Sequence, residues 1–397
     1  MISSKMQNMI GKSSIIRSMF EEGKALSAKF GAENVFDFSL GNPNIPSPPQ
    51  LNRAISEIVN TVDGVTLHGY MSNSGHDSTR NAIANSLNAR YGTDYDTSNI
   101  VMTVGAAGGL NVLLKCLVNP ADEVIVFSPY FGEYANYIDN YDGKLVAVEC
   151  PPPDFLPDAN LLAQAITPRT KVVIINNPNN PTGAVYDSEC LAKIAQTLRD
   201  KQAQFGQPIF LIADEPYREL VFDGAQVEHL PLVYDNTIIA YSYSKSLSLA
   251  GERIGYIAIG QHCADKNDLV SACGVATRIL GFVNAPSLQQ LAIEKCVDLT
   301  ADLTAYDNNR KLLSSSLAQL GFEFAQPRGA FYLFVRTPID DLEFCNMAKK
   351  YNILIVPSRA FGCKGYARIA YCVSEKTIKN SLPSFAKLAK ELNISSI

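Results

Sequence analysis

The amino-acid sequence predicts an α/β protein with a mostly parallel, seven-stranded sheet and helices on both faces of that sheet. Three observations favour this fold class. The chain has 397 residues, 47% of them are apolar, and short β-branched runs alternate with longer helix-compatible stretches between residues 100 and 260. Such alternation is typical of strands joined by helical crossovers, which bury a parallel sheet on both faces. Because a single hydrophobic core stops growing at about 250 to 300 residues, we also expect a second domain.

Seven apolar runs are expected to form the strands of this sheet. Several of them are almost entirely apolar, as burial on both faces requires. Turn residues such as Asn119-Pro120 and Pro151-Pro152-Pro153 separate them from the helix-compatible stretches. The predicted strands are residues 100–104, 124–127, 145–148, 172–175, 209–213, 237–241 and 254–259.

The remaining residues are expected to form a smaller α+β domain. A long helix-compatible stretch follows residue 285, and apolar runs at 331–335, 353–356 and 367–372 come after it. The first 45 residues hold a helical segment around 14–30 and a short apolar run at 35–40, and they are too few to fold alone. The prediction is a large domain of residues 46–285. Residues 1–45, including an N-terminal arm, would join residues 286–397 in the small domain.

Composition and charge exclude several classes of protein. Only 18% of the residues are charged, and 34 basic against 39 acidic residues give a net charge of −5, without the basic field that nucleic-acid binding needs. No window of about 18 apolar residues predicts a membrane span, and the first 20 residues do not form a secretory signal. The nine cysteines are scattered without a C-x-x-C pair. We therefore expect a cytoplasmic protein with reduced thiols and no metal site.

Polar motifs follow four of the predicted strands at the point where each strand ends. In an open α/β sheet, ligands bind outside the carboxyl ends of the strands. The motif DEPY follows strand 209–213, and SYSK follows strand 237–241, with Arg253 eight residues beyond its lysine. NNPNNPTG follows strand 172–175, and GAAGG follows strand 100–104 and precedes a helix. We expect these motifs to meet in one crevice.

Two of these motifs suit a phosphate group. A glycine-rich turn that opens a helix presents free N–H groups and the positive end of the helix dipole to an anion. Ser242 and Arg253 add a hydroxyl and a planar guanidinium. Taken alone, GAAGG is more often explained by close packing of a helix against a strand.

The other motifs suit an aromatic aldehyde that carries this phosphate. Asp214 can hold the proton of a pyridinium nitrogen, and Tyr217 and Asn180 can donate to the phenolate oxygen of the same ring. Lys245 is flanked by serines rather than acids, so desolvation would leave a free amine able to form a Schiff base. Singly, Asp214 could cap a turn and Lys245 could be solvated. Because these residues follow three strands whose ends are expected to meet in one crevice, binding of a common ligand is favoured over these separate explanations.

On these residues the chain resembles the class I aminotransferases that depend on pyridoxal phosphate, with the fold type I of aspartate aminotransferases. SYSKSLSLAGERIGY matches the lysine signature of that family at every restricted position from Ser242 to Gly255. NPNNPTG and the spacing of Asp214 and Tyr217 in ADEPY agree with it. The resemblance extends from FSLGNPNIPSP at 38–48 to GYARIAYC at 365–372, which is nearly the whole chain.

The resemblance implies roles for the residues around the cofactor ring. Lys245 would carry pyridoxal 5′-phosphate as an internal aldimine and then move the proton between the substrate α-carbon and C4′ of the cofactor. Asp214 would keep the ring nitrogen protonated, so that the ring acts as an electron sink. Tyr217 and Asn180 would lower the pKa of the aldimine through the ring oxygen. Phe131 would stack on the ring because the chain has no tryptophan.

The resemblance also implies how the phosphate and the substrate are held. Arg368 would pair with the α-carboxylate, helped by the backbone near Gly41, although a buried ion pair is the ordinary explanation for such an arginine. Ala107 stands where many relatives have a polar or basic side chain, so the backbone alone would make that contact. Tyr130 is the alternative to Phe131. The phosphate ligands would be Gly105, Ala106, Ala107, Ser242, Arg253 and Tyr70, the last from a second subunit unless it is a plain surface tyrosine.

The motif set favours transamination from an L-amino acid to a 2-oxo acid. A C–S β-lyase of the same fold and a catalytically silent, cofactor-bound regulatory protein remain alternatives, because local spacing does not separate them. A dicarboxylic substrate would need a second cation. Arg278 of the neighbouring subunit is the candidate, with a solvated arginine as the plainer explanation and Arg17 and Arg359 as rivals. Because Tyr70 and Arg278 both require a neighbour, we expect a homodimer with shared active sites.

Overall fold

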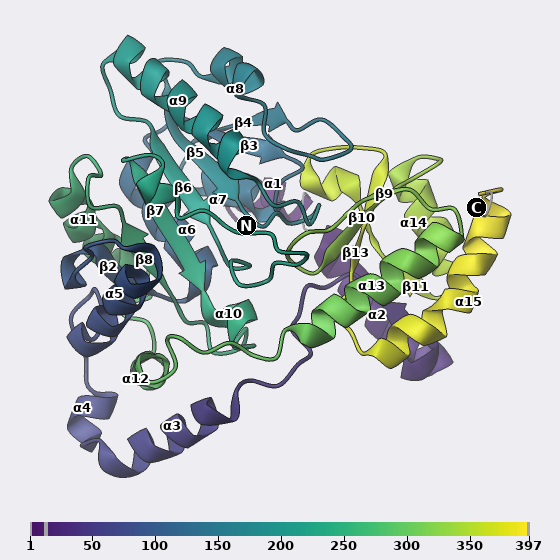
Figure 1. Ribbon diagram of the computed structural model, residues 1–397, viewed down its shortest axis with the longest axis horizontal. Coiled ribbons are helices and arrows are strands. Elements are labelled where there is room, and N and C mark those ends of the chain that lie inside the picture. Colours follow the sequence, from purple (N-terminus) through teal and green to yellow (C-terminus); the bar gives the residue numbers. More distant parts are fainter. Residues whose placement is uncertain (1, 12–14, 395–397) are drawn as a thin grey trace.

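The computed structural model describes residues 2–11 and 15–394 and shows two units side by side (Figure 1). The helices are α1 (Ser4–Gly11), α2 (Ile15–Phe30), α3 (Pro49–Thr61), α4 (Gly64–His68), α5 (Asp77–Tyr91), α6 (Gly105–Leu117), α7 (Glu133–Asn140), α8 (Ala159–Ala165), α9 (Ser188–Phe205), α10 (Tyr243–Ser246), α11 (Lys266–Ile279), α12 (Ser287–Glu294), α13 (Thr304–Gln319), α14 (Asp341–Lys349) and α15 (Glu375–Glu391). The strands are β1 (Phe36–Asp37), β2 (Ile100–Thr103), β3 (Glu123–Ser128), β4 (Lys144–Glu149), β5 (Thr170–Asn176), β6 (Phe210–Asp214), β7 (Thr237–Ser242), β8 (Gly255–Ile259), β9 (Phe324–Ala325), β10 (Tyr332–Arg336), β11 (Ile353–Leu354), β12 (Val356–Pro357) and β13 (Tyr366–Ala370).

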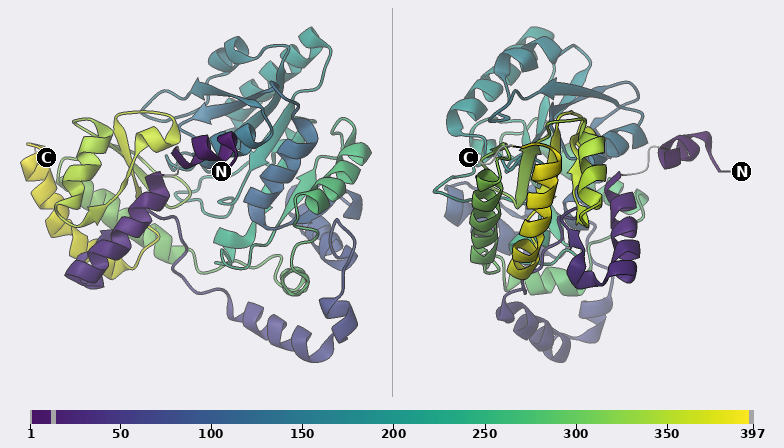
Figure 2. Two further views of the ribbon diagram at one scale, coloured as in Figure 1. Left: turned by 180° about the vertical axis from the view of Figure 1, so that it is seen from behind. Right: turned by 90° about the vertical axis from the view of Figure 1, so that its right-hand side faces the viewer.

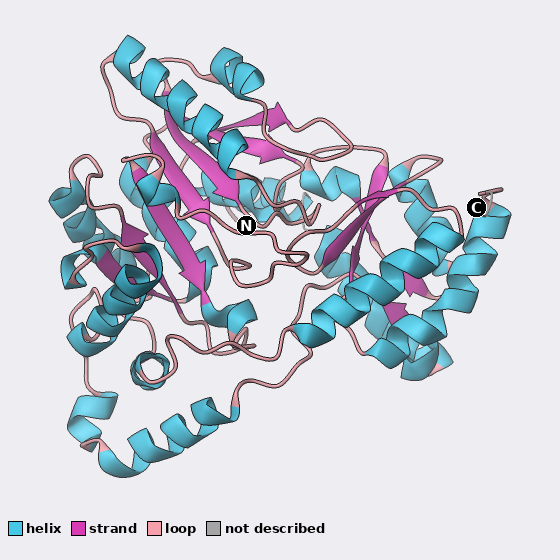
Figure 3. Ribbon diagram, in the orientation of Figure 1, coloured by secondary structure: helices cyan, strands magenta, loops and turns pink. Residues whose placement is uncertain are grey.

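The larger unit is built on a seven-stranded sheet in the order β2-β8-β7-β6-β5-β3-β4. Strand β8 runs antiparallel to β2 and β7, and the other neighbouring strands are parallel. Figure 3 shows the strands as a twisted layer with helices around it. Each of the seven strands falls on a predicted run, so the predicted fold class is confirmed.

The sheet is buried on both faces, which explains why its strands are continuously apolar. In β3, Val124 and Val126 enter one core, whereas Ile125 and Phe127 enter the other, and none of the four is more than 3% exposed. Residues of α6, α7 and α11 complete the core that Val124 joins. Residues of α5, α8, α9 and α12 line the opposite face. Two-sided burial removes the polar alternation that a half-exposed strand shows.

The smaller unit contains a four-stranded sheet in the order β12-β13-β10-β9, covered by α13, α14 and α15. The prediction of one strand over 353–356 is wrong, because β11 and β12 belong to different sheets. Leu354 of β11 pairs with Asp37 of β1, whereas Val356 of β12 pairs with Arg368 of β13. Strand β9 was not predicted. The other two predicted strands of this unit correspond to β10 and β13.

Helix α2 and strand β1 lie along the smaller unit (Figure 2), whereas Lys5 of α1 pairs with Asp142 of the larger unit at 2.8 Å. Helix α2 covers the predicted helical segment from residue 15, and residue 14 lies outside the described residues. Strand β1 forms the parallel pair with β11, and Figure 2 shows α1 standing away from α2. The domain boundaries at residues 45/46 and 285/286 stay a prediction. No helix among the described residues is long and apolar enough to cross a membrane.

Candidate active site

A cavity of about 290 Å³ opens at the carboxyl ends of the large-sheet strands and reaches the smaller sheet. Neighbouring strands bring its residues together, since Asn176 of β5 pairs with Asp214 of β6, and Asp214 pairs with Ala240 of β7. Arg368 comes from β13 on the opposite side. The predicted site residues that line the cavity are Gly41, Ala106, Ala107, Phe131, Asn180, Asp214, Tyr217, Ser242, Lys245, Arg253 and Arg368.

One end of the cavity is a cradle for an anion at the start of α6. Val104 precedes the helix and provides no side-chain cap, so the first N–H groups of the helix are left for a ligand. Gly105 opens the helix with φ 76°, and a Cβ at this position would stand 2.7 Å from Arg253 Nη2. A glycine is therefore required where the helix end meets the guanidinium. Gly105 itself does not line the cavity; it allows the close approach.

Arg253 and two serine hydroxyls face this cradle. Arg253 donates to Ser244 Oγ at 3.4 Å and to Ala250 O at 3.0 Å. Among the described residues it has no carboxylate partner, so its charge is uncompensated within this chain. Ser242 Oγ lies 2.7 Å from Ser244 Oγ. This end of the cavity is electropositive and rich in donors, which fits a phosphate.

Lys245 follows β7 in α10, and its amine points into the cavity. Its Nζ donates to Gly41 O at 2.7 Å and makes no ion pair among the described residues. Burial is the main cause that lowers the pKa of Lys245 to about 8; Cys372 opposes this shift, and the nearby cations Arg253 and Arg368 act in the same direction as burial. A large fraction of this amine is therefore uncharged in mildly alkaline solution, and an uncharged amine is a nucleophile.

Asp214, at the end of β6, is a buried carboxylate with one oxygen bonded and one free. Tyr134 Oη donates to its Oδ2 at 2.5 Å, whereas Oδ1 is buried without a hydrogen-bond partner. Burial is the main cause that raises the pKa of Asp214 to about 7; Glu215 raises it further, and the Tyr134 hydrogen bond opposes the rise. A free carboxylate oxygen in a dry site is costly unless a cationic donor occupies it.

Tyr217 and Asn180 lie where β6 and β5 end. Tyr217 Oη is 2.8 Å from Tyr332 Oη, and burial raises its pKa well above the usual value, so the hydroxyl stays protonated. The backbone N–H of Asn180 donates to Asn176 Oδ1 at 2.7 Å, which fixes the loop of the NNPNNPTG motif. The Tyr217 hydroxyl and the backbone of the Asn180 loop are therefore held in the cavity wall.

Arg368 is only 2% exposed, yet it contacts no carboxylate in the part of the chain that the structure describes. Its guanidinium lies between the rings of Tyr332 and Phe361, with centroids at 4.5 and 4.8 Å. It donates to Asn180 Oδ1 at 2.9 Å and to Ser39 O at 2.6 Å, while Nε has no partner. The plainer explanation, a buried ion pair, does not hold here. A carboxylate ligand would neutralise this charge.

The two aromatic residues considered for stacking on the cofactor ring, Phe131 and Tyr130, lie in different places. Phe131 lines the cavity, whereas Tyr130 packs against Gly362 and donates its backbone N–H to Phe361 O. Phe131 also packs edge-on against Tyr134, with ring centroids 5.6 Å apart. The geometry thus favours Phe131 over Tyr130.

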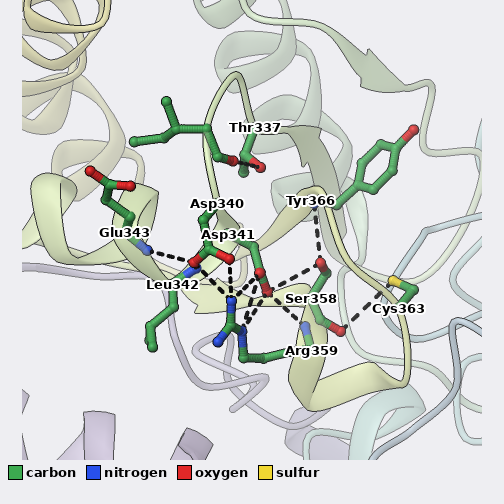
Figure 4. A network of polar contacts seen from close by, with 10 residues as sticks. Thr337, Asp340, Asp341, Leu342, Glu343, Ser358, Arg359, Cys363 and Tyr366 are labelled. Atoms are coloured by element: carbon green, nitrogen blue, oxygen red, sulfur yellow. Dashed lines mark hydrogen bonds and ion pairs between the residues drawn. The ribbon is translucent and has the colours of Figure 1, made fainter.

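The structure does not bring Tyr70 and Arg278 into this cavity. Tyr70 is 93% exposed, and Arg278 is exposed in the last turn of α11. Of the rivals for Arg278, Arg359 is occupied by Asp340 and Asp341 in the network of Figure 4. The side chain of Arg17 lies outside the described residues. Among the described residues of this subunit, the cations that line the cavity are therefore Lys245, Arg253 and Arg368.

Sequence reasoning missed four residues that shape the site. Tyr134 holds Asp214, Tyr332 contacts Tyr217 and Arg368, Ser244 contacts Arg253, and Asn176 holds the Asn180 loop. Ser244 and Asn176 stand inside the quoted motifs and could have been found there. Tyr134 lies one helical turn after Phe131, which was the available signal for it.

Comparisons with known proteins identify the family. The model of the aminotransferases of class I and II matches residues 33–385. This chain belongs to that family. The aspartate aminotransferase of Pyrococcus horikoshii is 28% identical to this aminotransferase over 95% of the chain and 94% of its own length. The aspartate/prephenate aminotransferase of Thermus thermophilus is also 28% identical, over 92% and 94%.

Solved structures agree with this membership. An aminotransferase structure from Eubacterium rectale has a TM-score of 0.96 and 45% identity, covering 99% of this aminotransferase and 100% of its own chain. The aspartate aminotransferase of Thermus thermophilus with maleate has a TM-score of 0.87 and 25% identity, covering 98% and 99%. The protein is thus a pyridoxal-phosphate-dependent aminotransferase that acts on amino acids and 2-oxo acids. The predicted enzyme class and cofactor are confirmed.

The described residues fit pyridoxal phosphate. The unpartnered Oδ1 of Asp214 suits the protonated ring nitrogen, and the uncapped start of α6 with Arg253 suits the phosphate. The buried amine of Lys245 suits the aldehyde. Among the described residues, no group of three or more His, Cys, Asp or Glu side chains could hold a metal ion. The covalent bond between Lys245 and the cofactor stays a prediction.

Proposed function

We propose that the aminotransferase works through the amine of Lys245, with Asp214 facing the cofactor ring and Arg368 facing the substrate. The observation that carries this proposal is that two buried reactive groups line the same cavity. Lys245 has an amine with a pKa of about 8 and no ion pair among the described residues, and Asp214 has a free buried oxygen. When bound, pyridoxal phosphate supplies an aldehyde and an electron-withdrawing ring.

Lys245 holds and moves the proton. Its Nζ would take the proton from the substrate α-carbon and give it to C4′ of the cofactor, because its pKa of about 8 is close to the working pH of a general base. The carbonyl of Gly41, which now accepts from Nζ at 2.7 Å, fixes the position of this amine. Tyr217 and Asn180 would donate to the phenolate oxygen of the ring, and Phe131 would pack against the ring.

Arg368 binds the substrate α-carboxylate. Its guanidinium is held by two aromatic rings and by the acceptors on Asn180 and Ser39, so it is rigid before the substrate arrives. A rigid planar guanidinium without an anionic partner is suited to bidentate binding of a carboxylate. The backbone near Gly41 completes this subsite.

We extend the proposal to a dicarboxylic amino donor, because relatives of this chain are named aspartate and aspartate/prephenate aminotransferases. The cations of the cavity, Lys245, Arg253 and Arg368, all have other roles. Arg278 is exposed and has no ionic partner among the described residues. It is the proposed second cation, supplied by a neighbouring subunit.

A homodimer is the assembly that this assignment needs. The loop at 70–75 lies against the segment after α11, since Asn284 Nδ2 donates to Ser72 O at 2.7 Å. Tyr70, Val65 and Ile279 are exposed on this part of the chain at 93%, 82% and 58%. Such an apolar surface suits contact with a second copy. A cytoplasmic location is part of the same proposal, supported by nine free cysteines.

The test is an amino-acid panel with 2-oxoglutarate and with pyruvate as acceptors. Aspartate or glutamate should bleach the yellow band of the bound cofactor, and a 2-oxo acid should restore it. Ammonia or thiol released without an acceptor would show a β-lyase instead. A band unchanged by every amino acid would show a silent binding protein.

A further inference from the structure

Tyr134 is a buried tyrosine on α7 that contacts two residues of the cavity wall, Asp214 and Phe131, but does not line the cavity itself. Its hydroxyl donates to Asp214 Oδ2 at 2.5 Å, and its ring packs edge-on against Phe131 with centroids 5.6 Å apart. Tyr134 is 2% exposed and Asp214 is 4% exposed. The same side chain therefore fixes the carboxylate and supports the ring that faces the cofactor.

The hydrogen bond has a fixed direction. Burial raises the pKa of Tyr134 well above its usual value, so Tyr134 stays the donor and Asp214 the acceptor. Besides Tyr134, the titratable groups that face Asp214 are Glu215, Tyr137 and Tyr217, and none of them bonds to Oδ1. A donor on Oδ2 stabilises the ionised carboxylate and leaves Oδ1 for a second donor.

We propose that Tyr134 is a positioning residue of the transamination reaction, whose hydroxyl orients the Asp214 carboxylate and keeps it ionised for the ring nitrogen. This inference rests on the proposed role of Asp214. It predicts that Tyr134 sets the pH range over which the cofactor binds. Below its pKa, Asp214 carries a proton, and it must lose this proton when a cofactor with a protonated ring nitrogen binds. The affinity of the protein for the cofactor therefore falls as the pH falls.

The probe is pyridoxamine 5′-phosphate, which has the ring and phosphate of the cofactor but no aldehyde for Lys245. We would titrate it by calorimetry into the full-length cofactor-free protein between about pH 6 and pH 9. The variants are Tyr134→Phe and Asp214→Asn. Tyr141→Phe is the matched control, because Tyr141 directly follows the same helix and its hydroxyl donates to Asn111 Oδ1 at 3.2 Å instead.

In the wild-type protein the affinity should fall below about pH 7, where Asp214 gains its proton. Tyr134→Phe should move this midpoint to higher pH and weaken binding at neutral pH by about tenfold, as one unit of pKa implies. Tyr141→Phe should match the wild type. A Tyr134→Phe protein with the wild-type midpoint and affinity would overturn the inference.

Failure of the inference and failure of the proposed role are distinguishable. Asp214→Asn should bind weakly at every pH and lose the Asp214-dependent midpoint; wild-type behaviour of this variant would refute the role of Asp214 itself. If Tyr134→Phe does not fold, 3-fluorotyrosine placed at position 134 provides the second test. Its more acidic phenol is a stronger donor, so the midpoint should move to lower pH, and an unmoved midpoint would overturn the inference.

Discussion

Arg368 of the smaller sheet donates to Asn180 Oδ1 of the large-sheet loop at 2.9 Å. This bond crosses the cavity between the two sheets and joins the proposed carboxylate subsite to the loop that faces the cofactor. Because Arg368 is buried without an anionic partner among the described residues, substrate binding would compensate its charge. The proposed recognition of the substrate and the bond between the two sheets thus involve the same guanidinium.

Replacement of Arg368 should weaken recognition of every amino acid, whatever its side chain. Arg368→Ala removes a charge-assisted pair worth about 1.5 to 3 kcal/mol, so kcat/KM should fall by about 10- to 100-fold for both glutamate and alanine. Steady-state kinetics with both donors measure this. Arg336→Ala is the control, since Arg336 pairs with Glu323 on the surface. Unchanged kcat/KM in Arg368→Ala would exclude this carboxylate subsite.

Arg278 should affect only dicarboxylic donors. Arg278→Ala is expected to raise KM for aspartate or glutamate and to leave alanine turnover unchanged, because alanine has no distal carboxylate to read. The measurement is the ratio of kcat/KM for glutamate and alanine. An equal loss for both substrates would show that Arg278 does not read the side chain. A monomeric active enzyme would exclude the assignments of both Arg278 and Tyr70.

A side chain at position 105 should weaken binding of the cofactor. In Gly105→Ala the added Cβ meets Arg253 at a residue with φ 76°, so both strain and the displaced guanidinium should weaken binding of pyridoxal phosphate. The matched control is Gly92→Ala, because Gly92 has φ 67° with nothing within 4 Å of the added Cβ. Both variants should lose about 1 kcal/mol or more of stability. Equal cofactor affinity in the two variants would contradict the role of the Gly105 contact.

The buried carboxyl of Asp214 should make the cofactor-free protein less stable as the pH rises. Its folded pKa of about 7 lies above its usual value of 3.8, so the folded state binds the proton more tightly than the unfolded state. The contribution is therefore present below about pH 4 and is lost progressively up to about pH 7. The difference in unfolding free energy between wild type and Asp214→Asn should follow this course. A difference that stays constant from pH 4 to pH 7 would contradict it.

The sequence predicted what local pattern controls. The seven large-sheet strands are continuous apolar runs because both faces are buried, and polar motifs follow the strands that end at the site. The division of residues 353–356 between two sheets depends on pairing with β1 and β13, which are distant in the chain. Tyr134 and Tyr332 could not be distinguished from core aromatics, since their function depends on contacts with Asp214 and Tyr217 across the fold. The roles proposed for Tyr70 and Arg278 require a neighbouring subunit, so they stay predictions.

The most direct measurement is the rate at which glutamate bleaches the bound cofactor in Lys245→Arg. This variant keeps a positive charge near the cradle formed by α6 and Arg253, so the cofactor should still bind. The absorbance of the bound cofactor is measured first to check this. Arginine stays charged and cannot accept the proton from the α-carbon. Loss of a general base should slow bleaching by at least about 100-fold. Bleaching at the wild-type rate would contradict the proposal that the amine of Lys245 carries the reaction.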